Sequence, residues 1–354
     1  MITTFHGKRI TGMLAAVPET EYDFDQETAH FANSQTKRLK RIMGFGTRRA
    51  AKATTSTGDM CHFVMQQLLD QNLINVQDVG AIIVCGLTPD YFVPHNSNIL
   101  HGEFGFSSDV VCVDIPQACC GFMMGMMEAA LLLEHMPRKK VLIFTGDVLN
   151  RKSREMPIYE PAFGGDACTV TVMENDEEAS DIYFCMNNDG ADREALIMHA
   201  GAWKMPRSPE TAIPRDTGDG QMKPYDALWM NGSMVFNFMQ REVPPMVDQL
   251  CEYAGVTKED LDVFFFHQPN KFMLQKLAQR MKVPASKMPM NIVGTFGNSS
   301  GSTIPVDICY NYGDRLANET VKCCLAGFGA GLTWSGAILD LGNLNFCQLV
   351  VSDF

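Results

Sequence analysis

Residues 114–135 read DIPQACCGFMMGMMEAALLLEH, which sets two adjacent cysteines between a short polar turn and a long apolar run. The run after Gly121 is apolar nearly all round, and this predicts a central, fully buried helix. A thiol at the head of such a helix meets unpaired N–H groups and the positive end of the helix dipole, which favour thiolate. Cys119 is therefore a candidate nucleophile. The competing interpretation is two inert packing thiols, because free cysteine is among the most buried residue types.

Short apolar runs rich in β-branched residues recur on both sides of this segment. They are VGAIIVCGL (79–87), DVVCVDI (109–115), KVLIFTGD (140–147), CTVTVME (168–174), DVFFFH (262–267) and TVKCCLAGF (320–328). Continuous rather than alternating apolarity predicts strands that are covered on both faces. Segments with helical character lie between them, at 57–72, 121–135, 234–254 and 270–282. This alternation predicts a layered α/β fold.

The chain also contains a weak internal repeat. INVQDVGAIIVCGLTPD (74–90) resembles VTKEDLDVFFFHQPN (256–270), and FGGDACTVTV (163–172) resembles FGAGLTWSGAIL (328–339). Two copies of one α/β unit would explain both pairs. We therefore expect an N-terminal half at 1–178 and a C-terminal half at 179–354. Residues 203–227 are rich in Pro, Gly and charge, and this stretch is far longer than a usual loop of about 4–6 residues, so it is expected to be a surface insertion.

Composition limits the function. With 354 residues, 46% hydrophobic and 20% charged, the chain can bury a large core. Its net charge of -12 argues against general nucleic-acid binding, which needs a basic surface. A local exception is a basic cluster without acidic residues, made of Lys37, Arg38, Lys40, Arg41, Arg48, Arg49 and Lys52. It is either a solvated helix face or a site for an anion or an acidic partner.

The cysteine spacing and the lengths of the apolar runs indicate the cellular compartment of the protein. The twelve cysteines form no CxxC pair, so neither a zinc site nor a disulfide framework is expected, and no metal is assigned. No stretch approaches the roughly 18 uncharged apolar residues of a membrane span. The N-terminus MITTFHGKRITG lacks the apolar segment of a signal peptide. A cytoplasmic protein without membrane association is the expectation.

A histidine and an asparagine are further candidates for an active site built around a cysteine. His267 ends the apolar strand DVFFF and leads the turn HQPN, and Asn298 lies in the loop GTFGNSSGSTIP, before a helix expected to begin near Ser302. Each alone is more often structural. Together with Cys119 they occupy strand ends of one layered fold, where they are able to converge on one pocket.

At these residues the chain resembles the ketoacyl-acyl-carrier-protein synthase III branch of the thiolase-fold condensing enzymes, from about residue 10 to 340. The matching stretches are GFGTRRAA, LTPDYFVP, DIPQACCGF, LIFTGDVL, MNGSMVFNF, FFFHQPN, FGNSSGSTIP and GFGAGLTWSGAIL. They occur in the same order as in the family, and the distances between them along the chain are close to the family's. The resemblance implies a homodimer with a thiolase fold, in which two duplicated α/β halves form a five-layered αβαβα sandwich.

The resemblance also implies roles. Cys119 would accept an acyl group from a thioester, and the acyl-enzyme would then be attacked by the carbanion of a decarboxylating malonyl thioester. His267 and Asn298 would hydrogen-bond the thioester carbonyl as enolate charge builds there. The backbone N–H groups of Cys119 and Ala330 would hold the oxyanion of acyl transfer. Acyl-CoA or acyl-carrier-protein thioesters would be the substrates, and no bound cofactor is implied.

The same resemblance suggests substrate-binding residues, namely Arg38, Arg41, Phe92, Val93, Gly232, Phe236, Asn270 and Lys271. Arg38 stands where acetyl-CoA-using members have a tryptophan, and the loop RKSREMPIYEPAF (151–163) has no clear counterpart of a second adenine-binding arginine. The adenine contact is therefore expected to be lost, which makes an acyl carrier protein a candidate partner of the basic cluster. Val93 lies in a loop that crosses the dimer in the family, so we expect a pocket larger than an acetyl group needs.

Other functions remain to be weighed. The nearest is a thiolase-fold acyltransferase that passes the Cys119-bound acyl group to an oxygen or nitrogen acceptor in a secondary-metabolite or polysaccharide pathway. Retention of Asn298 favours decarboxylative condensation instead. A degradative thiolase needs a CxG motif where this chain reads GFGAGLTW, and no glutamate marks a hydroxymethylglutaryl-CoA synthase. A papain-like protease would want different flanking residues, and a non-catalytic partner subunit would typically lose the nucleophile.

Overall fold

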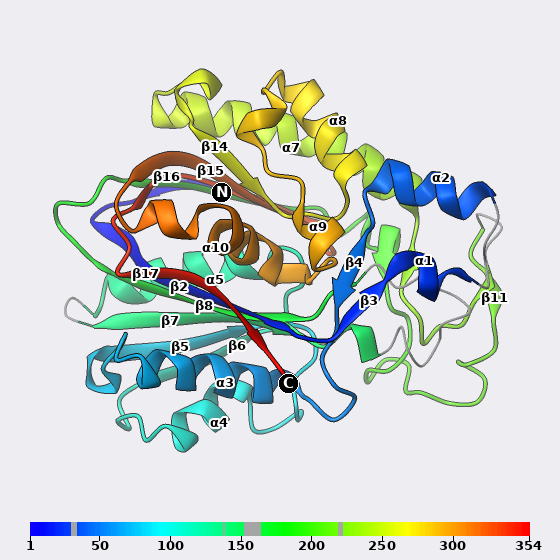
Figure 1. Ribbon diagram of the computed structural model, residues 1–354, viewed down its shortest axis with the longest axis horizontal. Coiled ribbons are helices and arrows are strands. Elements are labelled where there is room, and N and C mark those ends of the chain that lie inside the picture. Colours follow the sequence, from blue (N-terminus) through cyan, green and yellow to red (C-terminus); the bar gives the residue numbers. More distant parts are fainter. Residues whose placement is uncertain (30–33, 137–138, 152–163, 219–221) are drawn as a thin grey trace.

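Two mixed β-sheets organise the protein, which is represented by a computed structural model describing residues 1–354 except 30–33, 137–138, 152–163 and 219–221 (Figure 1). The six-stranded sheet has the order β17 (Phe346–Ser352), β2 (Lys8–Pro18), β8 (Ala167–Asn175), β7 (Lys140–Asp147), β5 (Val79–Cys85) and β6 (Val111–Ile115). The five-stranded sheet has the order β1 (Ile2–Phe5), β9 (Ile182–Asn188), β16 (Thr333–Gly342), β15 (Thr320–Gly329) and β14 (Val263–Phe266).

Helices form three layers around these sheets (Figure 1). The central layer is α5 (Gly121–Leu133) with α10 (Thr303–Leu316), and its apolar side chains share one core with both sheets. The outer layers are α3 (Thr57–Asp70) with α4 (Asn96–Glu103), and α7 (Gly232–Ala254) with α8 (Lys271–Met281). Each outer layer closes a separate hydrophobic core against one sheet. The predicted five-layered αβαβα fold is confirmed.

Helix α5 is largely but not fully buried. Its buried residues are Gly121, Phe122, Met123, Gly125, Met126, Ala129, Ala130 and Leu133. Leu131, however, is 48% exposed, so one strip of this helix reaches the surface of the chain. The helix is central, as predicted, but the expectation that it is fully buried was wrong, because one side of it reaches the surface.

The six predicted strands are all present, as β5, β6, β7, β8, β14 and β15. The first pair of similar segments has similar local structure, because a short 3-10 turn leads into β5 (η2, Val76–Asp78) and another into β14 (η4, Lys258–Asp260). Each end of the chain adds a strand to the sheet that is formed mainly by the other half. β1 pairs with β9 in the C-terminal sheet, and β17 pairs with β2 in the N-terminal sheet. The division into halves at residue 178 stays a prediction, and these exchanged strands tie the halves together.

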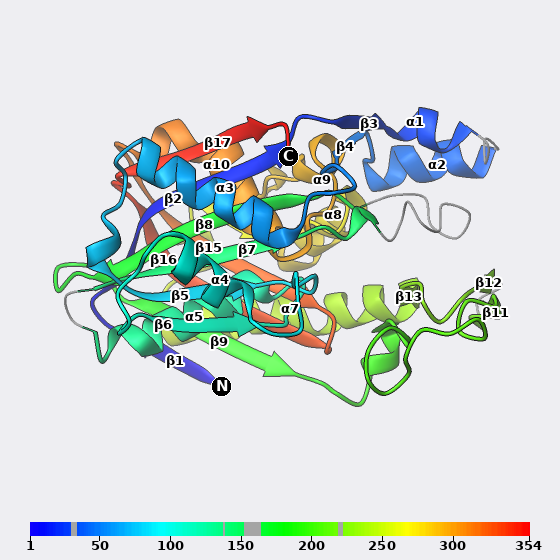
Figure 2. The ribbon, with the colours of Figure 1, turned by 90° about the horizontal axis from the view of Figure 1, so that it is seen from below.

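Two projections extend from the same end of the layered body (Figure 2). One contains β3 (Glu21–Asp23), α1 (Phe24–Glu27), α2 (Ser34–Met43) and β4 (Thr47–Arg49). The other contains β10 (Leu196–Ile197), β11 (Arg215–Asp216), β12 (Met222–Lys223) and β13 (Trp229–Met230). Smaller turns are η3 (Arg193–Ala195), η5 (Ala285–Lys287), η6 (Ser300–Ser302) and α9 (Ile292–Thr295).

The predicted insertion at 203–227 lies in the second of these projections, apart from 219–221, which fall outside the described residues. It is not a bare loop. The rings of His199, Tyr225 and Trp229 pack on one another with centroids 4.9–5.3 Å apart, and the indole of Trp229 donates to the Pro224 carbonyl at 2.8 Å. This aromatic cluster gives the projection a small core of its own.

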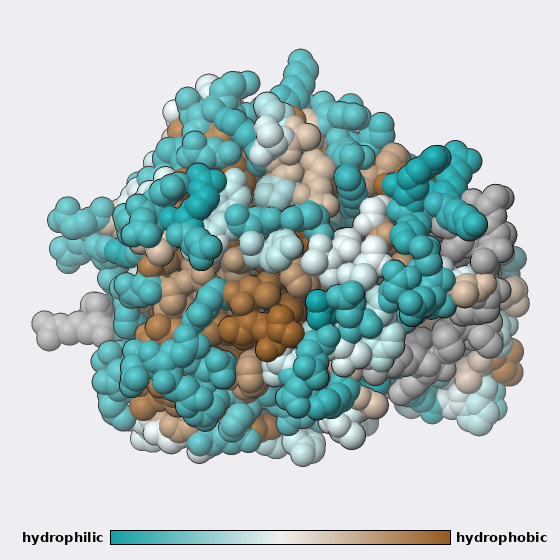
Figure 3. Space-filling view, viewed as in Figure 1, coloured by the Kyte–Doolittle hydropathy of each residue, from teal (hydrophilic) through white to brown (hydrophobic). Residues whose placement is uncertain are grey.

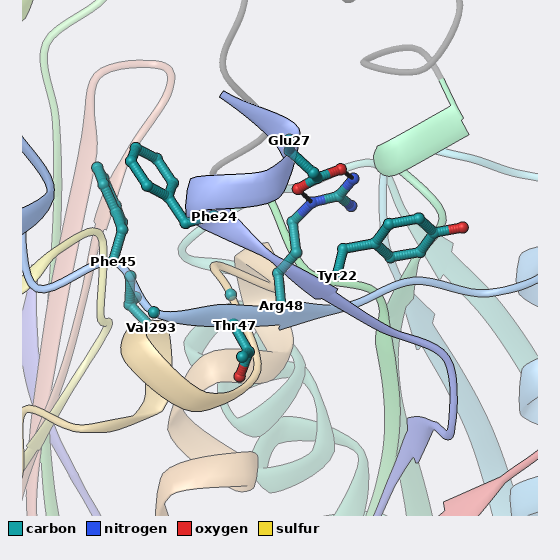
Figure 4. A pocket seen from close by; sticks show the side chains of 9 residues that line it. Tyr22, Phe24, Glu27, Phe45, Thr47, Arg48 and Val293 are labelled. Atoms are coloured by element: carbon teal, nitrogen blue, oxygen red, sulfur yellow. Dashed lines mark hydrogen bonds and ion pairs between the residues drawn. The ribbon is translucent and has the colours of Figure 1, made fainter. Parts of the chain in front are cut away.

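The basic cluster divides into two parts. Arg48 is 4% exposed, pairs with Glu27, donates to Asn150 Oδ1 at 2.6 Å, and borders a small hollow (Figure 4). Lys40, Arg49 and Lys52 also pair with carboxylates. Exposed basic residues on α2 are Lys37, Arg38 and Arg41. Part of the expected surface cluster is therefore structural, because tertiary contacts bring acidic partners from elsewhere in the chain.

The surface seen in Figure 3 is largely hydrophilic, with a hydrophobic patch near its centre, where β17 runs in Figure 1. β17 is an edge strand, and its Val351 is 55% exposed. Among the described residues, no helix is both long and apolar enough to cross a membrane.

Candidate active site

Cys119 lies in the turn between β6 and α5. The Gly121 N–H donates to the Ala118 carbonyl at 2.7 Å and closes this turn, and Cys120 takes the N-cap position of α5. Cys119 is partly exposed, whereas Cys120 is 1% exposed and its Sγ lies 3.5 Å from the Thr333 carbonyl. The two neighbouring thiols therefore face different surroundings, and Cys119 is the accessible one.

The turn between β15 and β16 closes over Cys119. A Cβ atom added at Gly329 would lie 2.6 Å from Cys119 Cβ and 2.8 Å from its Sγ, so this close approach requires glycine. The next residue, Ala330, directs its backbone N–H at the Cys119 sulfur. That contact puts the predicted main-chain donor beside the predicted nucleophile.

His267 directly follows β14, and its N–H donates to the Ala326 carbonyl at 2.8 Å, continuing the ladder with β15. Its ring is 2% exposed, and burial lowers the pKa of His267 to about 4, so the imidazole is neutral near pH 7. The Thr303 hydroxyl lies 2.7 Å from His267 Nδ1 and 3.0 Å from the Ser300 carbonyl. When that hydroxyl proton points at Nδ1, the ring carries its own proton on Nε2.

Asn298 lies between α9 and η6. Its Oδ1 accepts a hydrogen bond from the Ser300 N–H at 2.9 Å, and its carbonyl accepts from Gly165 N–H at 2.9 Å. Gly297 makes this packing possible, because its φ is +84° and an added Cβ would lie 2.7 Å from Gly165 N. With Oδ1 engaged, the NH₂ end of the Asn298 amide is the end that can donate to a ligand.

Ser300 is the common neighbour of these side chains. Its N–H donates to Asn298, its carbonyl raises the pKa of His267, and its hydroxyl lowers the pKa of Cys119, each against the larger effect of burial on that pKa. The structure thus brings Cys119, His267, Asn298 and Ala330 to one place, at the ends of β6, β14 and β15. The sequence interpretation missed Ser300 and Thr303, although both stand in the quoted loop GTFGNSSGSTIP.

In the free protein the Cys119 side chain is a protonated thiol and not the thiolate that was expected at the helix head. Burial raises the pKa of Cys119 to about 11, and the charge of Asp147 adds to this rise. The N–H groups of Cys119 and Ala330 and the Ser300 hydroxyl oppose the rise but do not cancel it. The expectation was wrong because desolvation of the thiolate outweighs the favourable N–H groups.

The raised pKa of Cys119 predicts how its rate of alkylation depends on pH. The thiolate fraction grows about tenfold per pH unit below the pKa, so the rate of Cys119 alkylation by iodoacetamide should rise about tenfold per unit between about pH 7 and 9. Peptide mass spectrometry at Cys119 measures this rate. The Cys120→Ala variant is the control and should follow the same profile, whereas a plateau below about pH 8 would contradict the prediction.

Several predicted substrate-binding residues surround helices α7 and α8. Lys271 is the exposed first residue of α8, and α2, which carries Arg38 and Arg41, packs beside α8. Gly232 is the exposed first residue of α7. Residues 152–163 of the loop expected to lack a second adenine-binding arginine lie outside the described residues.

Two of the remaining candidates have clear structural contacts. Phe236 of α7 stacks on Phe272 of α8, with ring centroids 5.7 Å apart. Asn270 caps α8, because its Oδ1 accepts from the Met273 N–H at 2.9 Å. The oxygen of this amide is therefore engaged in holding the helix.

Phe92 and Val93 are 70% and 77% exposed, in the segment between β5 and α4. The Phe92 ring lies 5.8 Å from the ring of Trp203, which is itself 84% exposed. The sequence interpretation did not anticipate this contact between the loop and the insertion. Side chains this exposed need a second molecule if they are to line a closed pocket.

The sequence and the fold of this chain have counterparts among known proteins. Residues 251–341 match the model of the 3-oxoacyl-[acyl-carrier-protein] synthase III C-terminal region, a range that holds His267, Asn298 and Ala330. A solved 3-oxoacyl-(acyl-carrier-protein) synthase from Burkholderia xenovorans is 30% identical, with a TM-score of 0.89 and 99% of each chain covered. The chain belongs to the 3-oxoacyl-acyl-carrier-protein synthase III family.

Curated members of the synthase III family are similar in sequence to this chain over nearly its whole length. The β-ketoacyl-acyl-carrier-protein synthase III of Trichormus variabilis is 27% identical over 339 residues, covering 95% of this chain and 99% of the relative. The Synechocystis enzyme of the same name is 27% identical over 339 residues, covering 96% and 99%. Family membership makes this protein a condensing enzyme, which is an acyl-transferring transferase that uses acyl thioesters.

Proposed function

We propose that the protein loads an acyl group onto Cys119 and condenses it with a malonyl thioester, releasing CO₂ and a 3-oxoacyl thioester. One observation carries this proposal: a partly exposed cysteine shares a single neighbour, Ser300, with a neutral histidine and an asparagine. The cysteine would serve the loading half-reaction, and the histidine and the asparagine would join it in the condensation half-reaction. Retention of all three supports condensation over transfer to an oxygen or nitrogen acceptor.

In the loading step, Cys119 Sγ attacks the thioester carbonyl carbon. A new S–C bond forms, the bond to the donor's sulfur breaks, and the thiol proton ends on the departing thiolate. The carbonyl oxygen becomes an oxyanion between the N–H groups of Cys119 and Ala330. Fixed main-chain donors of this kind stabilise the tetrahedral state more than the ground state.

In the condensation step, the C–C bond to the malonyl carboxylate breaks and CO₂ leaves, so the electron pair becomes an enolate. The enolate oxygen would accept hydrogen bonds from the His267 ring and the Asn298 NH₂ group. The enolate carbon then attacks the acyl carbonyl, the S–C bond to Cys119 breaks, and the Cys119 thiolate takes up one proton from solvent. Because the pKa of His267 is about 4, its ring stays a neutral donor throughout.

The proposed donor or acceptor is an acyl carrier protein. Lys37, Arg38 and Arg41 of α2 lie exposed beside α8, whose first residue is the exposed Lys271. This basic surface stands out on a chain with a net charge of -12, and it would attract an acidic carrier by complementary charge. Arg38 offers no flat ring for an adenine base, which favours a carrier-bound thioester over coenzyme A.

We further propose a homodimer. The exposed apolar side chains of Phe92, Val93 and Trp203 support a contact between subunits, because contiguous exposed apolar groups mark interaction sites. In such a dimer the loop carrying Phe92 and Val93 would close the acyl pocket of the partner, and the smaller Val93 would leave room for chains longer than acetyl.

A labelled substrate tests the function. The enzyme is incubated with a panel of acyl thioesters, each as the CoA and as the carrier-protein form, and with malonyl-carrier thioester labelled with ¹³C in its free carboxylate. We expect one ¹³CO₂ for each 3-oxoacyl thioester formed, with faster turnover from carrier-bound donors. Acylated Cys119 without any consumption of malonyl thioester would overturn condensation and leave plain acyl transfer.

A further inference from the structure

One buried hydroxyl at the site has no assigned role. Ser300 is 4% exposed, and within the described part of the chain its Oγ has no hydrogen-bond partner that meets ordinary geometry. A buried hydroxyl without a partner is costly, so most are paired in folded proteins. Ser97, Thr171 and Ser299 also have an unpaired buried hydroxyl among the described residues, but that of Ser300 is the one that shifts the pKa of the candidate nucleophile.

The backbone holds Ser300 in an unusual conformation. Its φ is 56°, in the left-handed region that residues with a side chain rarely adopt. The Asn298 amide oxygen accepts a hydrogen bond from the Ser300 N–H at 2.9 Å, and the Thr303 hydroxyl oxygen lies 3.0 Å from the Ser300 carbonyl oxygen. Conformations of this kind persist where the surroundings enforce them, and they concentrate at functional sites.

The loop that carries Ser300 presses directly on the turn that carries Cys119. A Cβ atom added at the next residue, Gly301, would lie 2.9 Å from the Ala118 carbonyl oxygen and 3.5 Å from Gly121 Cα. Ala118 and Gly121 flank the two cysteines on either side. The position of the Ser300 hydroxyl relative to Cys119 is therefore determined by close packing of two backbones.

We propose that Ser300 is a further catalytic residue, whose hydroxyl donates a hydrogen bond to the Cys119 sulfur when that sulfur is negatively charged. The sulfur carries charge twice in the proposed cycle, as it attacks the thioester and as the C–S bond breaks after condensation. Ser300 keeps its proton in both steps. This inference rests on Cys119 as the nucleophile.

The chemistry of sulfur explains why the hydroxyl is unpaired in the resting protein. A neutral thiol is a weak acceptor, whereas hydrogen bonds to an ionised acceptor are roughly twice as strong as neutral ones. The Ser300 hydroxyl is among the groups that lower the pKa of Cys119 against the effect of burial. A donor that gains its partner only in the charged state stabilises that state selectively.

The neighbouring Ser299 is a matched control. It is 2% exposed, and its Oγ likewise lacks a partner among the described residues. Ser299 is not among the groups that shift the pKa of Cys119 most. Deleting its hydroxyl removes the same atom from the same loop without removing a donor to the sulfur.

Alkylation of Cys119 by iodoacetamide, followed by peptide mass spectrometry over a range of pH, tests the proposal without any acyl substrate. At about pH 8 we expect Ser300→Ala to slow alkylation about tenfold and to move the pH profile upward, as loss of a hydrogen bond to a charged group predicts. Ser299→Ala should stay within about twofold of the wild type. Wild-type profiles in Ser300→Ala would overturn the proposal.

A second variant separates the hydroxyl from the backbone strain. Ser300→Gly also lacks the hydroxyl but adopts a φ of 56° without strain, so it should show the same upward shift as Ser300→Ala. A wild-type profile in Ser300→Gly would assign the effect to the backbone and overturn the proposal.

The failure of this inference is distinguishable from failure of the proposed function. If Cys119 of the wild type reacts no faster than the buried thiols, the nucleophile assignment fails and the Ser300 role fails with it. If Cys119 reacts as predicted but the Ser300 variants match the wild type, only the Ser300 role fails.

Discussion

The Cys119→Ala variant is expected to form no acyl-enzyme and to lose condensation by about 10⁴-fold or more, because covalent catalysis has no substitute at this position. The adjacent thiol cannot take over. Cys120 is 1% exposed, its sulfur lies 3.5 Å from the Thr333 carbonyl, and burial raises its pKa well above the usual value. Intact-protein mass spectrometry after incubation with acyl-CoA and acyl-carrier thioesters measures the acylated fraction directly.

Cys120→Ala is the matched control for that experiment. It removes the neighbouring sulfur and leaves the turn and Cys119 in place, so it should acylate at close to the wild-type rate. Its small packing defect should appear in the free energy of unfolding instead. Persistent acylation of Cys119→Ala would move the nucleophile elsewhere and overturn the loading step.

The His267→Ala and Asn298→Ala variants should each lower malonyl-thioester decarboxylation by about 10²–10³-fold, the usual effect of removing one preorganised oxyanion donor. Both side chains are neutral donors at a site where enolate charge would develop. The pKa of His267, about 4, means that its contribution should not titrate between about pH 6 and 8. Release of ¹³CO₂ from labelled malonyl-carrier thioester measures the loss.

Loading of Cys119 is the internal control for these variants. The proposed oxyanion donors of that step are the backbone N–H groups of Cys119 and Ala330, which neither substitution removes. Acyl-enzyme formation should therefore continue within a few fold of the wild-type rate. Decarboxylation that is undiminished in both variants would exclude the condensing role of His267 and Asn298.

The central strands could be predicted from sequence because burial on both faces leaves a local trace. β5 is buried at every position and reads as one continuous apolar run. β17 was not predicted, because it is a half-exposed edge strand whose sequence FCQLVVS mixes polar and apolar residues. Its pairing with β2 joins the two ends of the chain, which no local pattern encodes.

The residues of the candidate site likewise include some that the sequence predicted and one that it did not. Cys119, His267 and Asn298 were found because each stands in a distinctive short motif at a strand end or in a glycine loop. Ser300 was overlooked, because a serine in a Gly/Ser loop has no distinguishing local pattern. Its importance comes from a left-handed backbone and from contact with a turn far away in sequence.

The sequence by itself determined the layered fold, because continuous apolar runs mark strands that are buried on both faces. Through motifs spread along the chain that resemble one family, it also determined which of two adjacent cysteines is the candidate nucleophile. Only the tertiary structure decided that Arg48 is buried against Glu27, and that Cys119 is a protonated thiol. Ion pairing and desolvation depend on atoms brought together from distant segments, and their balance is set by packing that adjacent residues do not specify.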